Sequence, residues 1–270
     1  MEKILSFARQ TAYEAGAILM GRRPDPARLQ LLETGTKTSP TDLVSALDKE
    51  SEEFIVRQIQ INFPDDGIVG EEGTDKISTS GRRWIIDPLD GTINYLYGAT
   101  QWAVSIAVED VEGLLVGVVY SPCGPLEYYA VRGQGAYRID CSGEVRLPIL
   151  SEKDLSVALF ATGFSYESSE RSKQAEVLQT VLPQIQDIRR HGAAALDLCM
   201  VADGSVDGYF EVGAKPWDYS AGVLIARESG AVASGLFGRD VSPQMVVCAA
   251  PKLQQAMITM LESIPSLQED

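Results

Sequence analysis

The first sixty residues carry apolar side chains at helical spacing. Over residues 2–22 they recur every three or four positions, at Ile4, Leu5, Ala8, Ala12, Ala15 and Leu19, which predicts an amphipathic helix. A second helix is predicted from Ser39-Pro40, an N-cap followed by proline at the first helical position, to Asn62. Residues 24–41 are rich in Pro, Gly and Thr, and we expect a mobile loop or hairpin there.

From Trp84 to about Tyr137, short apolar runs alternate with turn residues. They predict a strand that ends at Asp87 and further strands at 102–109, 114–121 and 126–132. Their short connections favour antiparallel pairing.

After residue 150 the pattern alternates between strands and helices. Strands are predicted at 156–161, 185–189, 207–211, 231–234 and 246–250, and helices at 168–182, 193–203, 218–229 and 251–262. The sequence therefore predicts an α+β first half, to about residue 150, and an α/β second half, about 151–270. We expect residues 1–270 to form a single domain.

Composition narrows the class of protein. The 270 residues are 45% hydrophobic and 23% charged, which is typical of a globular chain. No apolar run reaches the roughly 20 residues that span a bilayer, and the first residues lack a secretory pattern, so we expect a cytoplasmic protein with no membrane partner. The four cysteines form no Cys-x-x-Cys pair, and His191 is the only histidine, which argues against zinc and paired-histidine chemistry.

The net charge of −15 affects which partners are expected. It would repel nucleic acid, so we predict no nucleic-acid partner. It would repel a phosphate substrate as well, unless metal ions reverse the local field. We expect most of the surplus acid, including Glu50, Glu52 and Glu53, only to keep the surface soluble.

Residues 84–94 are the most informative stretch. A buried apolar run ends in Asp87 and Asp90, and Gly91-Thr92 follows at once. Two hard oxygen ligands beside a turn lined by amides can hold a divalent cation next to a phosphate. A polar turn after a core strand would use the same residue types, so this stretch alone does not decide between the two interpretations.

Two further acidic motifs favour the metal site: Gly70-Glu71-Glu72-Gly73 and residues 216–222, which contain Trp217-Asp218. With these motifs the chain resembles the inositol monophosphatase family of magnesium-dependent, lithium-sensitive phosphatases. The resemblance also covers residues 36–44, 103–107, 133–136 and 209–211. It implies a layered α-β-α-β-α sandwich of the α+β class, and a homodimer.

The resemblance also implies a set of metal ligands. Glu71, Asp87 and the Leu89 carbonyl would hold one Mg²⁺, and Asp87, Asp90 and Asp218 a second. A third, weaker Mg²⁺ would lie near Glu71. Four carboxylates around one spot repel one another strongly without cations.

The expected reaction is in-line hydrolysis of a phosphate monoester. Glu71, Asp90 and Thr92 are the expected catalytic residues, with Glu71 and Thr92 acting on the attacking water. The amides of Gly91 and Thr92 are expected to bind phosphate oxygens. Thr92 could instead be only a turn or cap residue.

Substrate choice is expected to depend on the second half. The helix start at Ala193 and Ala194 would present amides to the ligand, and Ala193 replaces a threonine that many relatives carry. Glu211 matches a position that contacts inositol hydroxyls in relatives, and Asp218 completes the predicted substrate-binding set.

Other positions are open between a functional and a structural role. His191 could line the pocket rim or make a structural hydrogen bond, and Trp217 is expected to be a core wedge. Glu72 is expected to shape its loop, and Asp48 could reach water near a metal or face solvent. Lys37 and Asp42 lie on the segment expected to close over the site.

Three substrates come into question. Hydrolysis of myo-inositol monophosphate is favoured. Fructose-1,6-bisphosphatase activity, alone or as a dual activity, is the close alternative, and 3′-phosphoadenosine-5′-phosphate is less favoured. A binding or regulatory protein with a retained metal site is a further possibility.

Overall fold

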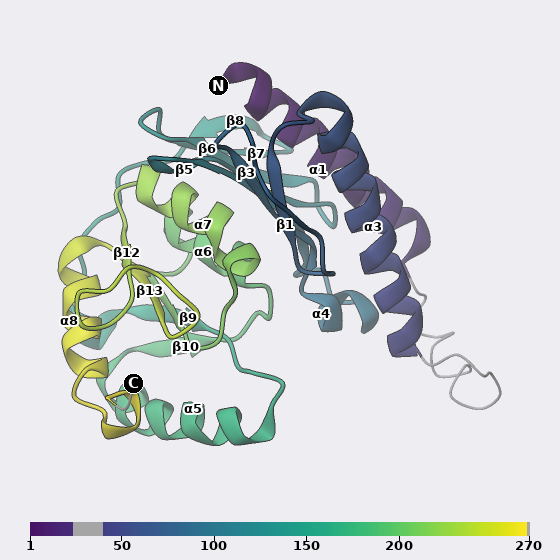
Figure 1. The fold of residues 1–270 in the computed structure, drawn as a ribbon. Helices are drawn as coiled ribbons and strands as arrows, with labels where there is room; N and C mark the ends of the chain where they lie inside the picture. The colour runs from purple at the N-terminus through teal and green to yellow at the C-terminus, as the bar shows by residue number, and fades with distance from the viewer. Residues whose placement is uncertain (24–39, 269–270) are drawn as a thin grey trace.

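The computed structural model describes residues 1–23 and 40–268, which form two β-sheets separated and flanked by helices (Figure 1). Helices α1 (Glu2–Arg22) and α3 (Pro40–Asn62) pack on one face of the larger sheet. Helices α6 (Ala194–Asp203) and α7 (Pro216–Glu228) lie between the two sheets, and α5 (Ser168–Val181) and α8 (Pro251–Leu261) lie beyond the smaller one. This arrangement confirms the predicted α-β-α-β-α sandwich.

The larger sheet has eight strands in the order β2-β1-β3-β4-β5-β6-β7-β8. The strands are β1 (Gly67–Gly70), β2 (Asp75–Lys76), β3 (Arg83–Asp90), β4 (Ala103–Asp110), β5 (Gly113–Ser121), β6 (Leu126–Val131), β7 (Ala136–Asp140) and β8 (Gly143–Arg146). Only β1 and β3 pair in parallel. The ends of β1 and β3 therefore lie side by side, and this edge carries two of the acidic motifs.

The smaller sheet has the order β10-β9-β11-β13-β12. Its strands are β9 (Leu159–Thr162), β10 (Asp187–Arg189), β11 (Gly208–Glu211), β12 (Val232–Ser234) and β13 (Val246–Ala249). Strand β9 is parallel to β10 and β11, whereas β13 is antiparallel to β11 and β12. The second half is therefore mixed, and the α/β prediction holds only for part of its sheet.

Most predicted elements are present, with shifted ends. Residues 155–157 form a 3₁₀ turn (Leu155–Val157), so the strand predicted at 156–161 begins at Leu159. Further 3₁₀ turns cover Leu182–Gln184 and Pro265–Leu267, and a short helix α4 covers Thr92–Leu96. Strands β1, β2, β7 and β8 were not predicted. The loop predicted at 24–41 lies outside the described residues up to residue 39, and Pro40 and Thr41 are helical.

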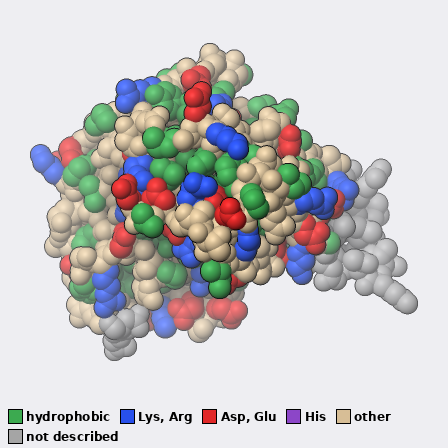
Figure 2. Space-filling view, turned by 45° about the horizontal axis from the view of Figure 1, so that its top comes forward, with side chains coloured by type: hydrophobic (Ala, Val, Ile, Leu, Met, Phe, Trp, Pro, Cys, Tyr) green, Lys and Arg blue, Asp and Glu red, His purple; other side chains and the backbone are tan. Residues whose placement is uncertain are grey.

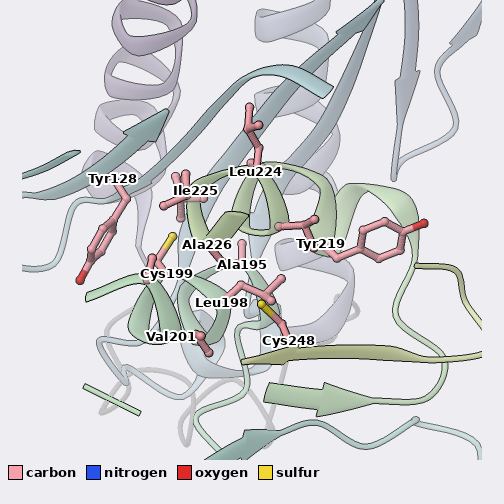
Figure 3. Packing of buried hydrophobic residues seen from close by; sticks show 14 of the residues in the cluster. Tyr128, Ala195, Leu198, Cys199, Val201, Tyr219, Leu224, Ile225, Ala226 and Cys248 are labelled. Atoms are coloured by element: carbon pink, nitrogen blue, oxygen red, sulfur yellow. The ribbon is translucent and has the colours of Figure 1, made fainter. Parts of the chain in front are cut away.

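The layer between the sheets is tightly packed and joins both halves of the chain. Leu198 and Cys199 of α6 and Ile225 of α7 lie in one buried cluster with Tyr128 of the larger sheet and Cys248 of the smaller (Figure 3). Cys199 and Cys248 are buried free thiols, as predicted.

Helix α7 approaches the larger sheet at a glycine of β5. A Cβ atom added at Gly117 would lie 2.8 Å from the carbonyl oxygen of Ala221 in α7 and 3.1 Å from its Cα. Only glycine fits this contact without a shift of one element.

Two features concern possible partners of the protein: the mixture of side chains on its surface and the length and polarity of its helices. Figure 2 shows a face on which acidic and basic side chains are interspersed with hydrophobic ones. In the part of the chain that the structure describes, the helices are too short or too polar to cross a membrane.

Candidate active site

The end of β3 carries the two aspartates of the central motif. Strand β3 is buried from Trp84 onward, and its pairing with β4 shifts register between Asp87 and Asp90. Pro88 lies within this shift and has no N–H for the sheet ladder. The Asp87 carboxylate accepts a hydrogen bond from the Leu89 amide at 2.9 Å. The Leu89 carbonyl, a predicted metal ligand, accepts one from the Thr92 hydroxyl at 3.1 Å.

Glu71 reaches the same place from the neighbouring strand. It follows β1, and its amide donates to the Ile86 carbonyl of β3 at 3.2 Å. Its carboxyl group lies close to that of Asp87, and the two interact electrostatically. The parallel pairing of β1 and β3 therefore joins two motifs that are separated in the sequence.

Asp218 and Asp90 are both fixed by backbone amides. Asp218 is the third residue of α7, and its carboxylate accepts the amide of Lys215 at 2.6 Å in a capping box. Asp90 accepts the amides of Ala194 at 3.2 Å and Ala195 at 2.8 Å. These amides at the start of α6 were expected to face a ligand, but in this structure they bond to Asp90.

One cleft of about 1150 Å³ brings the predicted site residues together. Its lining includes every residue predicted for metal binding, catalysis or substrate binding: Glu71, Asp87, Leu89, Asp90, Gly91, Thr92, Ala193, Ala194, Glu211 and Asp218. Among the described residues, no group of three or more His, Cys, Asp or Glu side chains is arranged to hold a metal ion as it stands. The four acids thus share a cleft without forming a closed coordination shell.

The electrostatics of these four acids are unusual. Burial, reinforced by repulsion from neighbouring carboxylates, raises the pKa values of Asp87 and Asp90 well above the usual range. Glu71 opens onto the cleft, but the surrounding protein limits its hydration, and its pKa is raised to about 7. Burial raises the pKa of Asp218 to about 6. Divalent cations would relieve this repulsion, so hard oxygen donors that crowd together fit Mg²⁺.

Gly91 makes the sharp turn after the motif possible. It has a φ of +89°, and a Cβ there would lie 2.8 Å from the Gln101 carbonyl oxygen and 3.2 Å from that of Gly192. The helix α4 that begins at Thr92 is fixed by Asn94, whose amide donates to the carbonyls of Gln101 and His191 at 2.6 and 2.7 Å. Sequence reasoning gave Asn94 no role.

Glu211 lies at the end of β11 and lines the cleft. Its carboxylate accepts the Tyr209 hydroxyl at 2.6 Å, and a Cβ at Gly163 would lie 2.0 Å from it. Burial raises its pKa to about 7, and repulsion from Asp218 adds to this shift although the Tyr209 bond opposes it. Glu211 is therefore not the surface acid that the sequence left open.

The structure decides some of the roles that the sequence left open. His191 makes a structural contact, because its Nδ1 lies 2.6 Å from the Asp197 carboxylate. Trp217 packs against the cluster between the sheets and also lines the cleft. Asp48 is buried and lines the cleft close to Thr92, so it does not face solvent. Lys37 and the Asp42 side chain lie outside the described residues.

Glu52 contradicts the expectation of a surface acid. It is 3% exposed and its carboxylate binds the turn that carries Glu71, whereas Glu53 beside it is exposed as expected. Four basic side chains also line the cleft and were not singled out from the sequence: Lys173, Arg190, Lys215 and Arg239.

The chain matches known proteins over nearly its whole length. The model of the inositol monophosphatase family matches residues 1–266. The chain is 38% identical over 278 residues to "Inositol-1-monophosphatase SuhB" of Mycobacterium tuberculosis, covering 98% of this chain and 96% of the relative. It is 37% identical over 277 residues to "Nus factor SuhB" of Pasteurella multocida, covering 100% and 99%.

Solved structures show the same fold. That of Mycobacterium tuberculosis SuhB has a TM-score of 0.83 at 36% identity, with 98% of each chain covered. An inositol monophosphate-bound staphylococcal inositol monophosphatase II has a TM-score of 0.78 at 26% identity, covering 97% of this chain and 94% of that one. The protein described here belongs to the inositol monophosphatase family.

Proposed function

We propose that this protein is a magnesium-dependent phosphomonoesterase that hydrolyses myo-inositol monophosphate to inositol and phosphate. One observation carries the proposal: Glu71, Asp87, Asp90 and Asp218 come from three separate motifs and line one cleft, with pKa values raised by burial. The names of the mycobacterial relatives point to the same substrate.

The residues assigned to the metal ions follow the family pattern. Glu71, Asp87 and the Leu89 carbonyl would hold one Mg²⁺, and Asp87, Asp90 and Asp218 a second, with a third near Glu71. When bound, Mg²⁺ supplies the positive charge that neutralises phosphate oxygens and makes water more acidic.

The chain's own groups would then position and deprotonate the attacking water. Glu71 lines the cleft next to Asp87 and is the proposed acceptor of the proton from that water. Thr92 is oriented by its bond to the Leu89 carbonyl, and the lone pairs of its hydroxyl oxygen are left to align the same water. The amides of Gly91 and Thr92 are the proposed phosphate contacts. Glu211 would contact the alcohol. Ala193 and Ala194 would line its side of the cleft, with the Ala194 amide bonded to Asp90.

A substrate panel tests the proposal. Purified full-length protein with Mg²⁺ should hydrolyse inositol 1-phosphate with a higher kcat/KM than fructose 1,6-bisphosphate or 3′-phosphoadenosine-5′-phosphate. Asp87→Asn should abolish turnover and serves as the control for contaminating phosphatases. Failure to hydrolyse any of the three would refute the proposal.

Fructose-1,6-bisphosphatase activity is the second candidate. It is favoured by the basic side chains that line the cleft, because Lys173, Arg190 and Lys215 offer positive charge to a second phosphate. Comparable kcat/KM values for inositol 1-phosphate and fructose 1,6-bisphosphate would establish a dual enzyme.

A third candidate function is that of a binding or regulatory protein rather than an enzyme. It is suggested by the name "Nus factor" that some relatives carry. An Asp87→Asn variant that loses turnover but still complements a deletion strain would support such a role. A homodimer and a cytoplasmic location remain predictions, and light scattering of the purified protein would test the first.

A further inference from the structure

Three buried polar side chains lie along one face of α3. Asp48, Ser51 and Glu52 are spaced three and four residues apart, and none is more than 4% exposed. Each contacts a different part of the site. Asp48 lies close to Thr92, the Ser51 hydroxyl donates to the Pro88 carbonyl at 3.4 Å, and Glu52 binds the turn after β1. Helix α3 thus contacts three of the segments around Glu71 and Asp87.

Glu52 makes the most extensive of these contacts. Its Oε2 accepts the Glu72 amide at 2.8 Å. Its Oε1 accepts both the amide of Thr74 at 3.0 Å and the hydroxyl of Thr74 at 2.6 Å. The turn is also closed on itself, since the Gly70 amide donates to the Thr74 carbonyl at 2.8 Å. The Glu52 carboxylate therefore accepts hydrogen bonds from three groups of this turn: the Glu72 amide and the amide and hydroxyl of Thr74.

Gly70 shows how closely the turn follows the carboxylate. A Cβ atom at Gly70 would lie 2.4 Å from Oε2 of Glu52. Glu71 stands between Gly70, which is packed on this carboxylate, and Glu72, whose amide is bonded to it. The backbone of Glu71 is thereby fixed on both sides.

We propose that Glu52 is a positioning residue, which sets the place of the Glu71 carboxylate beside Asp87 by holding the turn from Gly70 to Thr74. The inference rests on the proposed function, because Glu71 matters as a metal ligand and proton acceptor only in a metal-dependent phosphatase. A buried acid that merely stabilised the fold would affect unfolding but not metal affinity.

The test compares Glu52→Gln with Glu53→Gln, a control at the exposed neighbouring position. The glutamine amide would face the Glu72 or the Thr74 amide, donor against donor. Positioning groups behind metal ligands typically change metal affinity by about 10- to 100-fold. We expect Glu52→Gln to raise the Mg²⁺ concentration for half-maximal activity by at least about tenfold. KM for inositol 1-phosphate at saturating Mg²⁺ should change by less than about threefold, because substrate contacts are intact.

A second readout does not depend on turnover. Binding of Mn²⁺ to the substrate-free proteins, followed by electron paramagnetic resonance, should weaken in Glu52→Gln and stay at the wild-type value in Glu53→Gln. Thermal unfolding in EDTA reports the structural effect separately. Wild-type metal binding in Glu52→Gln, with only a lowered melting temperature, would overturn the inference.

Two milder variants keep the inference testable if Glu52→Gln does not fold. Thr74→Val removes one hydroxyl donor and should weaken Mn²⁺ binding by about threefold. Gly70→Ala forces the turn away from the carboxylate and should weaken it further. Wild-type Mn²⁺ binding by both variants would refute the positioning role. Absence of Mg²⁺-dependent hydrolysis in the wild-type protein would instead refute the proposed function.

Discussion

The Asp90 carboxylate, at the end of β3, accepts the Ala195 amide of α6 at 2.8 Å. The two residues belong to different halves of the chain and to different layers of the fold. A proposed metal ligand is thus held by the first turn of a helix that also lines the substrate side of the cleft.

Because of this contact, Asp90→Asn should affect both the proposed metal site and the start of α6. The substitution keeps the size, removes a negative charge and leaves only one good acceptor for the amides of Ala194 and Ala195. We expect kcat/KM for inositol 1-phosphate to fall by at least about 1000-fold, because loss of a needed metal ligand removes several kcal/mol of transition-state stabilisation. Circular dichroism should stay unchanged. Near-wild-type turnover in saturating Mg²⁺ would contradict the two-metal assignment.

Glu211→Ala should change the preference among substrates more than the hydrolysis of a simple phosphate ester. Only a polyol offers hydroxyl groups to this carboxylate, and a hydrogen bond to a charged acceptor contributes about 1.5–3 kcal/mol. We expect kcat/KM for inositol 1-phosphate to fall roughly 10- to 100-fold and that for an aryl phosphate to change by less than about threefold. Equal losses on both substrates would assign Glu211 to the metal site or the fold.

The same residue predicts how this preference depends on pH. Because the pKa of Glu211 is raised to about 7, the carboxyl group is protonated below that pH and becomes a weaker acceptor. The ratio of kcat/KM for inositol 1-phosphate to that for the aryl phosphate should therefore decrease as pH falls below about 7. In Glu211→Gln the ratio should be independent of pH.

Cation binding should stabilise the fold. The four acids of the cleft repel one another, so Mg²⁺ should raise the melting temperature, and Asp87→Asn should lose most of this increase. Mg²⁺ should activate and Ca²⁺ should inhibit, since calcium takes larger and looser shells. Lithium inhibition is expected from the family alone. Full activity with Ca²⁺, measured by phosphate release, would contradict the geometric argument.

Asp66 should govern stability in acid. It is fully buried and accepts hydrogen bonds from Arg82, Ser80 and Trp84, and these outweigh the effect of burial, so its pKa is lowered. A lowered folded-state pKa stabilises above the unfolded value of about 3.9, and this stabilisation is lost as pH falls through the folded pKa. Asp66→Asn should cost about 2–4 kcal/mol at pH near 7.

The difference between wild type and Asp66→Asn should shrink as pH falls below about 4, in urea unfolding followed by fluorescence. Asp65→Asn, at an exposed neighbouring position, is the control and should match wild type. A difference that stays constant with pH would show that the Asp66 charge is not responsible.

A substitution in the turn at Phe237 should stabilise the fold. Phe237 and Gly238 have φ values of +57° and +70°, and the Arg239 amide closes the turn on the Leu236 carbonyl at 3.1 Å. Asn-Gly is favoured in such turns, whereas a bulky residue at positive φ costs about 1–2 kcal/mol. Phe237→Asn should therefore raise the free energy of unfolding by about 1 kcal/mol, and Gly238→Ala should lower it. A decrease in Phe237→Asn would mean that packing of the ring outweighs backbone strain.

The proposed metal ligands could be selected from the sequence because each is part of a short, ordered motif. Asp87 and Asp90 follow a recognisable strand, and Asp218 stands behind Pro216 at a helix start. Their assembly in one cleft agrees with the family resemblance rather than with spacing alone.

Glu52 could not be predicted in this way. Its partners are two backbone amides and one hydroxyl about 20 residues further along the chain, and helix spacing does not reveal them. Its place one residue after Ser51 and four after Asp48, on the face that also carries Ile55 and Ile59, was the available signal. The short strands β1 and β2 were missed because pairing, not local propensity, defines them: β1 pairs in parallel with β3, and β2 pairs antiparallel with β1.

Gly117 lies in the core, but it sets the distance between β5 and the helix that carries Asp218 of the proposed metal site. It allows Ala221 to contact β5, and Ala221 is one helical turn after Asp218. A single methyl group at this position would tilt or lift α7 and move the Asp218 carboxylate without touching it. Displacements below an ångström are enough to impair positioned catalysis. Variants that retain all four acids can therefore be inactive. The reason for such a loss of activity should be sought at the contact between α7 and β5, beneath the cleft.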